Sequence, residues 1–448
     1  MLPDVALLEI FHFYLVFHEG PKAWHTLVHV CRKWRNVVFG SPRRLNLRLL
    51  CTHKTPVREM LDVWPHLPIE VFDVRSEALD MDNIFAALDL HDRIYELCLS
   101  YSDKPGLEKV LAAMQQPFPE LTNLFIGDGD DSTPVQTDSF LGGSAPRLRL
   151  LTLTGIPFPE LPKLLLSATH LVDLSLERIP DSGYISLEAM IAGLTGLASL
   201  KILKIEYESY PIIPYQKSQY PPLQTPILLP VLTRLLFRGV YEYLEDFVAR
   251  VDAPLLNQLD ITYLQEESLD TPRLAEFISR APKLSEARVE FTCWPEEVQV
   301  ILPQASCGKI DLRISCDEDV QLPCLAQLCS SFFRRAPISV AEHLHLTQNG
   351  TYESYWSPDI ESNQWLELFL SFPAVKRLHI PPEFVPRIAP ALQLAVERGT
   401  EVLPALQAFF FETLPSEPVR EIIRQFAVAP FRTGRTTTVF FGKSLMNN

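Results

Sequence analysis

One short pattern recurs along most of the chain and constrains its fold more than any other feature. Leu-x-x-Leu-x-Leu, with other large apolar residues allowed at the leucine positions, has clear copies at Leu148-Leu151-Leu153 and at Leu232-Leu235-Phe237. The middle apolar residues of all copies form a series with a mean spacing of about 28 residues. A single copy has no weight, but a long periodic series predicts an internally repeated structure. The series is 45, 69, 97, 124, 151, 174, 203, 235, 259, 287, 312, 344, 378, 409 and 439.

Each repeat predicts one strand followed by one helix. Alternating Leu-x-Leu residues are typical of a strand with one buried face, and apolar residues with helical spacing occur between many of the copies. The chain has 38 prolines against 17 glycines, and many helical stretches run up to a proline, as at Phe372-Pro373 and Leu403-Pro404. Because proline cannot continue a helix and favours an extended residue before it, we expect it to stop each helix ahead of the next strand. The expected helices are Leu187–Leu194, Tyr243–Val251, Pro272–Arg280, Leu322–Phe333, Gln364–Phe372, Ile388–Glu397 and Val419–Phe426.

Neither half of such a repeat can bury its apolar face alone, so neighbouring repeats must stack. In this respect residues 43–448 resemble leucine-rich-repeat proteins, which implies an α/β solenoid with a parallel sheet on the concave face and helices outside. The family usually has Asn or Cys three residues after the Leu-x-Leu, whereas this chain has Ile156, Ile179, Val240 and Leu264 there. Repeat lengths also vary from 23 to 34 residues. We therefore expect an irregular solenoid; the alternative, a doubly wound α/β domain, would have fewer strands and Gly-rich turns.

Residues 1–42 lack the repeat and predict a short helical module. Leu2-Pro3-Asp4 is typical of a helix start, and a second apolar cluster with helical spacing follows Gly20-Pro21. The two ends of this segment resemble the F-box motif, in which Leu-Pro and an acid open the sequence and Val-Cys-Arg-x-Trp-Arg ends it. The matching residues are Leu2, Pro3, Asp4, Leu7, Leu8, Ile10 and Phe11, followed by Val30, Cys31, Arg32, Trp34 and Arg35.

The F-box resemblance implies a function. F-boxes dock onto a Skp-type adaptor that links them to a cullin–RING ubiquitin ligase, and the region after the F-box captures a protein substrate. The chain also resembles large fungal families of F-box proteins with repeat-like C-terminal regions. It is thus expected to be a non-catalytic substrate receptor. Three alternatives remain open: these residues are only the core of a helical cap on the solenoid, the chain is a repeat scaffold without a ligase role, or it is an enzyme with an unrecognised site. The adaptor-binding residues that the resemblance implies are Leu2, Pro3, Leu7, Leu8, Ile10, Phe11, Val30, Cys31 and Trp34.

The residues that flank the buried leucines of each strand should project from the concave face. In the second half of the chain these residues are mostly charged, which favours a surface that binds the protein substrate; ordinary solubility of an exposed face is the alternative. The predicted substrate-facing residues are Arg234, Arg238, Asp260, Glu286, Arg288, Glu290, Asp311, Arg313, His345, Arg377 and His379.

No sequence motif of a known catalytic site is present, so we expect no enzyme activity, no catalytic residue and no cofactor. Asp128-Gly129-Asp130 superficially resembles a phosphate-transfer motif, but an acidic surface loop is the preferred interpretation. His343, His345 and His379 fall on the same predicted face, with His345 and His379 in equivalent positions of neighbouring strands. Three such histidines could bind a metal or respond to pH, but a solvated polar face is preferred and no metal site is expected.

The net charge is −15, although residues 1–60 carry a small positive excess. An acidic chain argues against general nucleic-acid binding. No long uncharged apolar run predicts a membrane segment, and the N-terminus has no signal-peptide pattern. The 8 cysteines are sparse and contain no Cys-x-x-Cys spacing, which favours free thiols and an intracellular location, cytoplasmic or nuclear.

Overall fold

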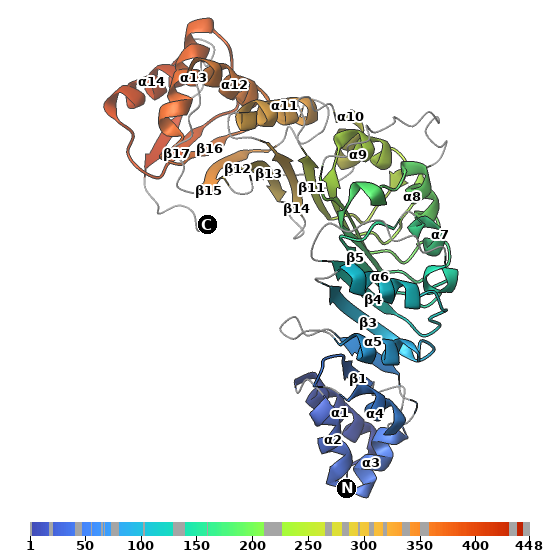
Figure 1. Ribbon diagram of the computed structural model, residues 1–448. Helices are drawn as coiled ribbons and strands as arrows, with labels where there is room; N and C mark the ends of the chain where they lie inside the picture. Colours follow the sequence, from blue (N-terminus) through green and yellow to red (C-terminus); the bar gives the residue numbers. More distant parts are fainter. Residues whose placement is uncertain are drawn as a thin grey trace. The chain divides into compact units, whose positions relative to one another are not determined.

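The computed structural model describes most of the chain as alternating strands and helices (Figure 1). The chain divides into two compact units, the first comprising Met1–Glu208 with Ile227–Val231 and the second comprising Ser209–Pro226 with Leu232–Asn448. The division falls inside the repeats, and the predicted boundary at residue 42 remains a prediction. The described residues are 2–17, 21–40, 47–54, 56–63, 66, 68–72, 80–101, 104–128, 139–158, 160–209, 226–264, 271–279, 286–293, 296–303, 309–316, 320–333, 341–349, 358–429 and 437–441.

The first unit begins with three helices, α1 (Asp4–Phe17), α2 (Pro21–Val30) and α3 (Arg32–Phe39). The strands β1 to β7 then follow one another in chain order across the sheet, and every adjacent pair is parallel. The elements after α3 are β1 (Leu47–Leu50), α4 (Val57–Val63), β2 (Ile69–Phe72), α5 (Met81–Leu88), β3 (Ile94–Tyr101), α6 (Lys104–Ala113), β4 (Asn123–Asp128), η1 (Phe140–Gly143), β5 (Leu150–Thr154), α7 (Leu161–Leu165), β6 (Asp173–Ile179), η2 (Asp181–Gly183), α8 (Leu187–Leu194), β7 (Ile202–Tyr207) and β8 (Ile227–Leu228).

The second unit continues the alternation, but its strands do not all follow chain order. The order across the sheet is β9-β11-β14-β13-β12-β15-β16-β17-β18. The elements are β9 (Arg234–Gly239), α9 (Tyr241–Val248), β10 (Val251–Asp252), β11 (Gln258–Leu264), α10 (Pro272–Ser279), β12 (Glu286–Cys293), β13 (Glu296–Pro303), β14 (Lys309–Ser315), α11 (Gln321–Phe333), β15 (His343–Asn349), α12 (Pro358–Leu370), β16 (Arg377–Ile380), α13 (Val385–Arg398), β17 (Ala408–Phe411), α14 (Glu417–Ala427) and β18 (Thr438–Phe441).

The repeat prediction is confirmed strand by strand. Fourteen of the positions in the predicted series fall inside a strand, and the remaining one, position 45, lies outside the described residues just ahead of β1. Each of the seven predicted helices overlaps a helix of the structure, and Leu187–Leu194 matches α8 at both ends. The chain therefore has an α/β architecture of repeated strand–helix units, with a mostly parallel sheet.

One strand departs from the parallel pairing that the repeats predict. β13 is antiparallel to both β12 and β14, and it separates these two strands in the sheet. The strand β13 thus lies between β12 and β14 in the chain, where the other repeats of the second unit carry a helix. Val298, Val300 and Leu302 alternate along β13 and are buried, so this strand has the same period-two pattern as its neighbours.

The core of each unit lies between the strands and the helices, which cover one face of the strands (Figure 1). The leucines of the repeat point into this core; Leu151, Leu153, Leu174 and Leu203 are all almost fully buried. The residues that replace the usual Asn or Cys are also buried, as Ile156 and Val240 illustrate. These positions therefore contribute apolar surface to the core instead of a polar ladder.

The helix ends are determined by capping side chains and by a glycine more than by the prolines. Asp80 and Ser186 cap α5 and α8 by accepting a hydrogen bond from the backbone N–H three residues on, at 3.1 and 3.3 Å. The helix α13 ends at Gly399, which has a φ of 64°, and not at Pro404. Leu403, which precedes Pro404, has a φ of 47°, so the expected extended residue before this proline was wrong. Pro373 and Pro404 both lie beyond the end of the preceding helix, in the turn before the next strand.

No helix among the described residues combines the length and the hydropathy that a bilayer-spanning segment needs.

Candidate functional site

The N-terminal module, α1 to α3, has a small apolar core of its own. Leu7, Leu8 and Phe11 lie on one side of α1 and are almost fully buried. The ring centroids of Phe11 and Trp34 lie 4.7 Å apart, so α1 packs directly on α3. Three of the predicted adaptor-binding residues therefore hold the module together and do not reach solvent.

Polar contacts fix the ends of these helices relative to one another. Lys33 Nζ donates a hydrogen bond to the carbonyl oxygen of Leu2 at 2.7 Å and lies 3.3 Å from the Asp4 carboxylate. Arg35 Nε donates to the carbonyl oxygen of Val28 at 3.0 Å. These contacts connect α3 to the start of α1 and to the end of α2, so the residues at both ends of the F-box-like motif are held in one module.

The opposite side of α1 exposes apolar side chains. Val5, Ile10 and Phe13 lie there, interleaved with the exposed Glu9 and His12. Covering large apolar side chains that are this exposed with a partner is favourable in free energy, because it removes apolar surface from water. Clusters of such side chains mark interaction sites. Pro3 and Cys31 are exposed as well. The exposed fractions are 52% for Leu2, 60% for Val5, 47% for Ile10, 65% for Phe13 and 53% for Val30.

Sequence reasoning missed Val5 and Phe13 as candidate contact residues. The signal was present: α1 is apolar on both sides, and a helix needs only one apolar side to pack in a three-helix module. The F-box motif directed attention to the matching residues, which are divided between the two sides of the helix.

A second candidate surface is the solvent side of the strands in the second unit. Arg234 and Arg238 on β9, and Thr262 on the adjacent β11, project from this face and are half-buried. In the register of the sheet Arg238 lies opposite Thr262, which in turn lies opposite Arg313 on β14. The Nε atoms of Arg234 and Arg238 are buried and have no hydrogen-bond partner among the described residues.

Asp311 anchors a charged network in the same face. Its carboxylate accepts hydrogen bonds from Gln299 Nε2 at 2.7 Å, from Lys309 Nζ at 2.9 Å, and from Arg313 Nε and Nη2 at 3.1 and 3.0 Å. Lys309 also lies 3.2 Å from the Asp260 carboxylate. Burial alone would raise the pKa of Asp311, but the hydrogen bonds from Arg313, Gln299 and Lys309 outweigh it and hold that pKa below its ordinary value.

The same network also shifts the pKa of Lys309. Burial lowers the pKa of Lys309, while its contacts with Asp311 and Asp260 raise it by more, so the net shift is upward. Asp311 itself is fully buried and is thus a structural residue of this face; only its partners can contact another molecule.

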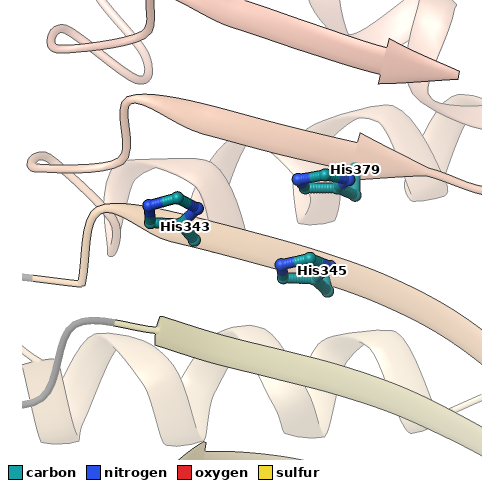
Figure 2. Close-up of side chains that lie close together, drawn as sticks. All are labelled: His343, His345 and His379. Atoms are coloured by element: carbon teal, nitrogen blue, oxygen red, sulfur yellow. The ribbon is translucent and has the colours of Figure 1, made fainter. Parts of the chain in front are cut away.

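The histidines His343, His345 and His379 lie close together on the same face, on β15 and β16. His345 on β15 lies opposite His379 on β16 in the parallel register, as predicted. Their rings stack with centroids 3.9 Å apart and planes 9° from parallel. His343 lies two residues before His345 on the same side of β15, and Figure 2 shows its ring beside the other two.

A ladder of rings continues from His379. Phe410 on β17 stacks on His379 at 4.4 Å, and Phe440 on β18 stacks on Phe410 at 4.8 Å. Each ring occupies the equivalent position of the next parallel strand, so the ladder follows directly from the strand register. This end of the face is consequently aromatic, whereas the end at β9, β11 and β14 is charged.

Some predicted site residues have no described side chain. Glu286, Arg288 and Glu290 lie on β12, where only the backbone register is described: Glu286 pairs with His343 and Arg288 with His345. Arg377 on β16 is exposed and pairs with His343. Of the acidic segment at Asp128-Gly129-Asp130, Asp128 ends β4 and the rest lies outside the described residues.

Comparisons with known proteins add one structural likeness. No protein-family model matches the chain, and no curated protein matches it in sequence. Among solved structures it is similar to the leucine-rich repeat-containing protein LegL7 from Legionella pneumophila, with 14% sequence identity over 85% of this chain and 97% of that chain, and a TM-score of 0.30. The α/β repeat architecture of this chain therefore rests on its own strand order and burial pattern.

Proposed function

We propose that this chain is a non-catalytic, intracellular substrate receptor of a Skp–cullin–F-box type ubiquitin ligase. In this proposal the N-terminal module docks onto a Skp-type adaptor, and the solvent face of the strands binds a protein substrate. The observation that carries it is the exposed apolar side of α1, in a module whose sequence resembles an F-box at both ends.

The adaptor interface is best placed on the exposed residues of the module. Leu2, Val5, Ile10 and Phe13 offer apolar area that an adaptor helix could bury, as in other helix-based interfaces. Val30 and Cys31 extend the exposed set to the junction of α2 and α3. Leu7, Leu8 and Phe11 support this surface from inside, so substitutions there would abolish binding only by unfolding the module.

The substrate surface is best placed on the second unit. Its outward residues include partly exposed arginines on β9 and the cations around Asp311, next to an aromatic and histidine-rich end. Mixed charge of this kind favours specificity and fast association with a protein of complementary charge.

Co-purification with a purified Skp-type adaptor tests the proposal. The full chain should bind the adaptor at a 1:1 ratio, and Ile10→Asp or Phe13→Asp should weaken binding at least about tenfold, because each places a charge in a buried apolar contact. A matched control is Leu166→Asp, which changes a leucine that is 62% exposed on another part of the first unit. Circular dichroism would verify that all three variants stay folded.

The second candidate is a repeat scaffold with no ligase role, and the large exposed face of the strands also favours it. It predicts that the folded chain does not bind the adaptor, with or without substitutions in α1. Adaptor binding that survives both Ile10→Asp and Phe13→Asp would contradict the proposed interface.

A further inference from the structure

We propose that His343, His345 and His379 form a binding site for a divalent transition-metal ion of the kind that prefers imidazole ligands, with Zn²⁺ as the probe. One nitrogen from each ring can be chosen so that all three atoms lie within 4.8 Å of one another. No other group of three or more His, Cys, Asp or Glu residues with this proximity occurs within the described part of the chain. The proposal is independent of the ligase role.

The fold itself places these three rings together. His345 and His379 are directly opposite in neighbouring parallel strands, and parallel strands are about 4.8 Å apart. His343 and His345 are two residues apart on one strand and therefore project from the same face. Figure 2 shows the rings of His345 and His379 on neighbouring strands, with the ring of His343 beside them along β15.

Only small movements convert this arrangement into a metal site. Zinc binds imidazole nitrogen at about 2.0–2.1 Å, which puts two nitrogens of a tetrahedral site about 3.4 Å apart. The His345 and His379 rings are now almost parallel, so their nitrogens point in parallel directions. A turn of each ring about its Cβ–Cγ bond, which is a soft torsion, aims both nitrogens at a shared position and opens the stack.

The surroundings favour a site that is accessible from solvent. All three histidines are half-buried, while the neighbouring Leu344, Leu346 and Leu378 are buried beneath the sheet. The backbone is thus fixed by the core, and the imidazole edges remain within reach of an ion. Sites on rigid elements hold ligands more accurately than sites on loops.

Nearby charges set the affinity. Arg377 is opposite His343 in the register, and Lys376 forms an ion pair with Glu342 at 2.5 Å. Arg377 adds positive charge and weakens cation binding, whereas the ion pair of Lys376 with Glu342 carries no net charge. Arg288 is opposite His345 on β12. We therefore expect micromolar affinity and not the much tighter binding of sites that include thiolates.

Three protein ligands leave the fourth tetrahedral position open. In zinc proteins such a position is taken by water or by another molecule. Here it faces solvent, so the bound ion could accept a histidine or carboxylate from a protein that covers the face.

Isothermal titration of the full, metal-free chain with Zn²⁺ at about pH 7.5 tests the site. The expected result is one ion per chain at micromolar affinity. His379→Phe should weaken this binding at least about tenfold; phenylalanine keeps the stack with Phe410 and removes the nitrogen, so the fold is preserved. His343→Ala gives an independent second variant, and His170→Ala, an exposed histidine outside the cluster, is the matched control and should bind as the wild type does.

Cobalt and pH distinguish this site from binding at the cysteines. Co²⁺ bound by imidazole should lack the near-ultraviolet thiolate charge-transfer band, and binding should be lost as pH falls below about 6.5, because protonated imidazole cannot bind a metal. Equal Zn²⁺ affinity in the wild type, His379→Phe and His343→Ala would overturn the proposal. A thiolate band, or no binding to the wild type at millimolar Zn²⁺, would overturn it as well.

Discussion

Gln299 on β13 donates a hydrogen bond of 2.7 Å to the Asp311 carboxylate on β14, and both side chains are buried. This contact crosses an antiparallel strand pair in a sheet whose other repeats are parallel. It adds a neutral hydrogen-bond donor to a carboxylate that also accepts hydrogen bonds from Lys309 and Arg313. It thereby connects the antiparallel strand β13 to the charged surface beside it.

Removing the charge of Asp311 should destabilise the second unit strongly. Asp311→Asn leaves Lys309 and Arg313 without their shared anion, and we expect a loss of about 3 kcal/mol in the free energy of unfolding, at the low end for a broken buried ion pair. The low end applies because the side chains of these cations stay 41% and 38% exposed. Urea unfolding measures the loss. Glu120→Gln, which removes one member of an exposed ion pair with Arg147, should cost less than about 1 kcal/mol.

The contribution of Asp311 should depend on pH in a defined direction. Its pKa is lowered in the folded state, so its stabilisation is complete above the unfolded value of about 3.9 and is lost as pH falls through the folded value. The difference in unfolding free energy between the wild type and Asp311→Asn should be constant from about pH 6 to 8 and should shrink below about pH 4. The difference is the proper measure because the pKa of Asp80 is also lowered, chiefly by its hydrogen bond from the Asn83 backbone. A difference that grows toward acid would contradict the assignment.

Most of the fold could be predicted because the repeat has a clear physical basis. Alternating leucines specify a strand with one buried face, and their recurrence specifies the stacking partner, as Leu151 and Leu174 show. The swapped order of β12, β13 and β14 could not be obtained in this way. Val298 and Val300 have the strand pattern, but nothing local specifies which neighbour they pair with; that choice is made by contacts such as Gln299 with Asp311.

The candidate sites were predictable to a smaller extent. The register of the strands correctly placed His345 beside His379, because parallel pairing transfers sequence position directly into space. The N-terminal motif did not distinguish inward from outward residues: Leu8 is buried and Ile10 is exposed, although both match the F-box pattern. Only packing against α3, through Phe11 and Trp34, determines which side of α1 faces solvent.

Two phenylalanines of α1 should therefore respond differently to truncation. Phe11→Ala removes a fully buried ring that contacts Trp34, and we expect a loss of about 3–4 kcal/mol, enough to unfold the module at moderate temperature. Phe13→Ala changes an exposed ring and should alter stability by less than about 0.5 kcal/mol. Thermal unfolding followed by circular dichroism compares them. A larger loss in Phe13→Ala than in Phe11→Ala would show that α1 packs with its other side inward.

The cysteines should differ in reactivity because only the thiolate is alkylated. Burial, with a smaller effect from the Asp80 charge, raises the pKa of Cys51 to about 12. Burial also raises the pKa of Cys329. Cys31 is exposed. Brief iodoacetamide treatment at about pH 8, read by mass spectrometry, should modify Cys31 and leave Cys51 and Cys329 unmodified until urea unfolds the chain.

The same labelling also reports on the proposed adaptor. Because Cys31 belongs to the exposed set of the N-terminal module, a bound adaptor should slow its modification, and the slowing should disappear in Ile10→Asp. Unchanged labelling in a verified adaptor complex would place the interface elsewhere on the module.

Gly399 gives a test of how α13 ends. Its φ of 64° lies in the left-handed region, and its backbone N–H bonds the carbonyl oxygen of Val396, while Thr400 N–H bonds that of Ala395 at 2.9 Å. A Cβ at this position would contact nothing within 4 Å, so the cost of Gly399→Ala is conformational, about 1 kcal/mol. Gly399→Asn should cost less, because asparagine tolerates this conformation better than alanine. Urea unfolding of the three proteins should rank them Gly, Asn, Ala in stability; an alanine variant as stable as the wild type would show that the helix end rearranges without cost.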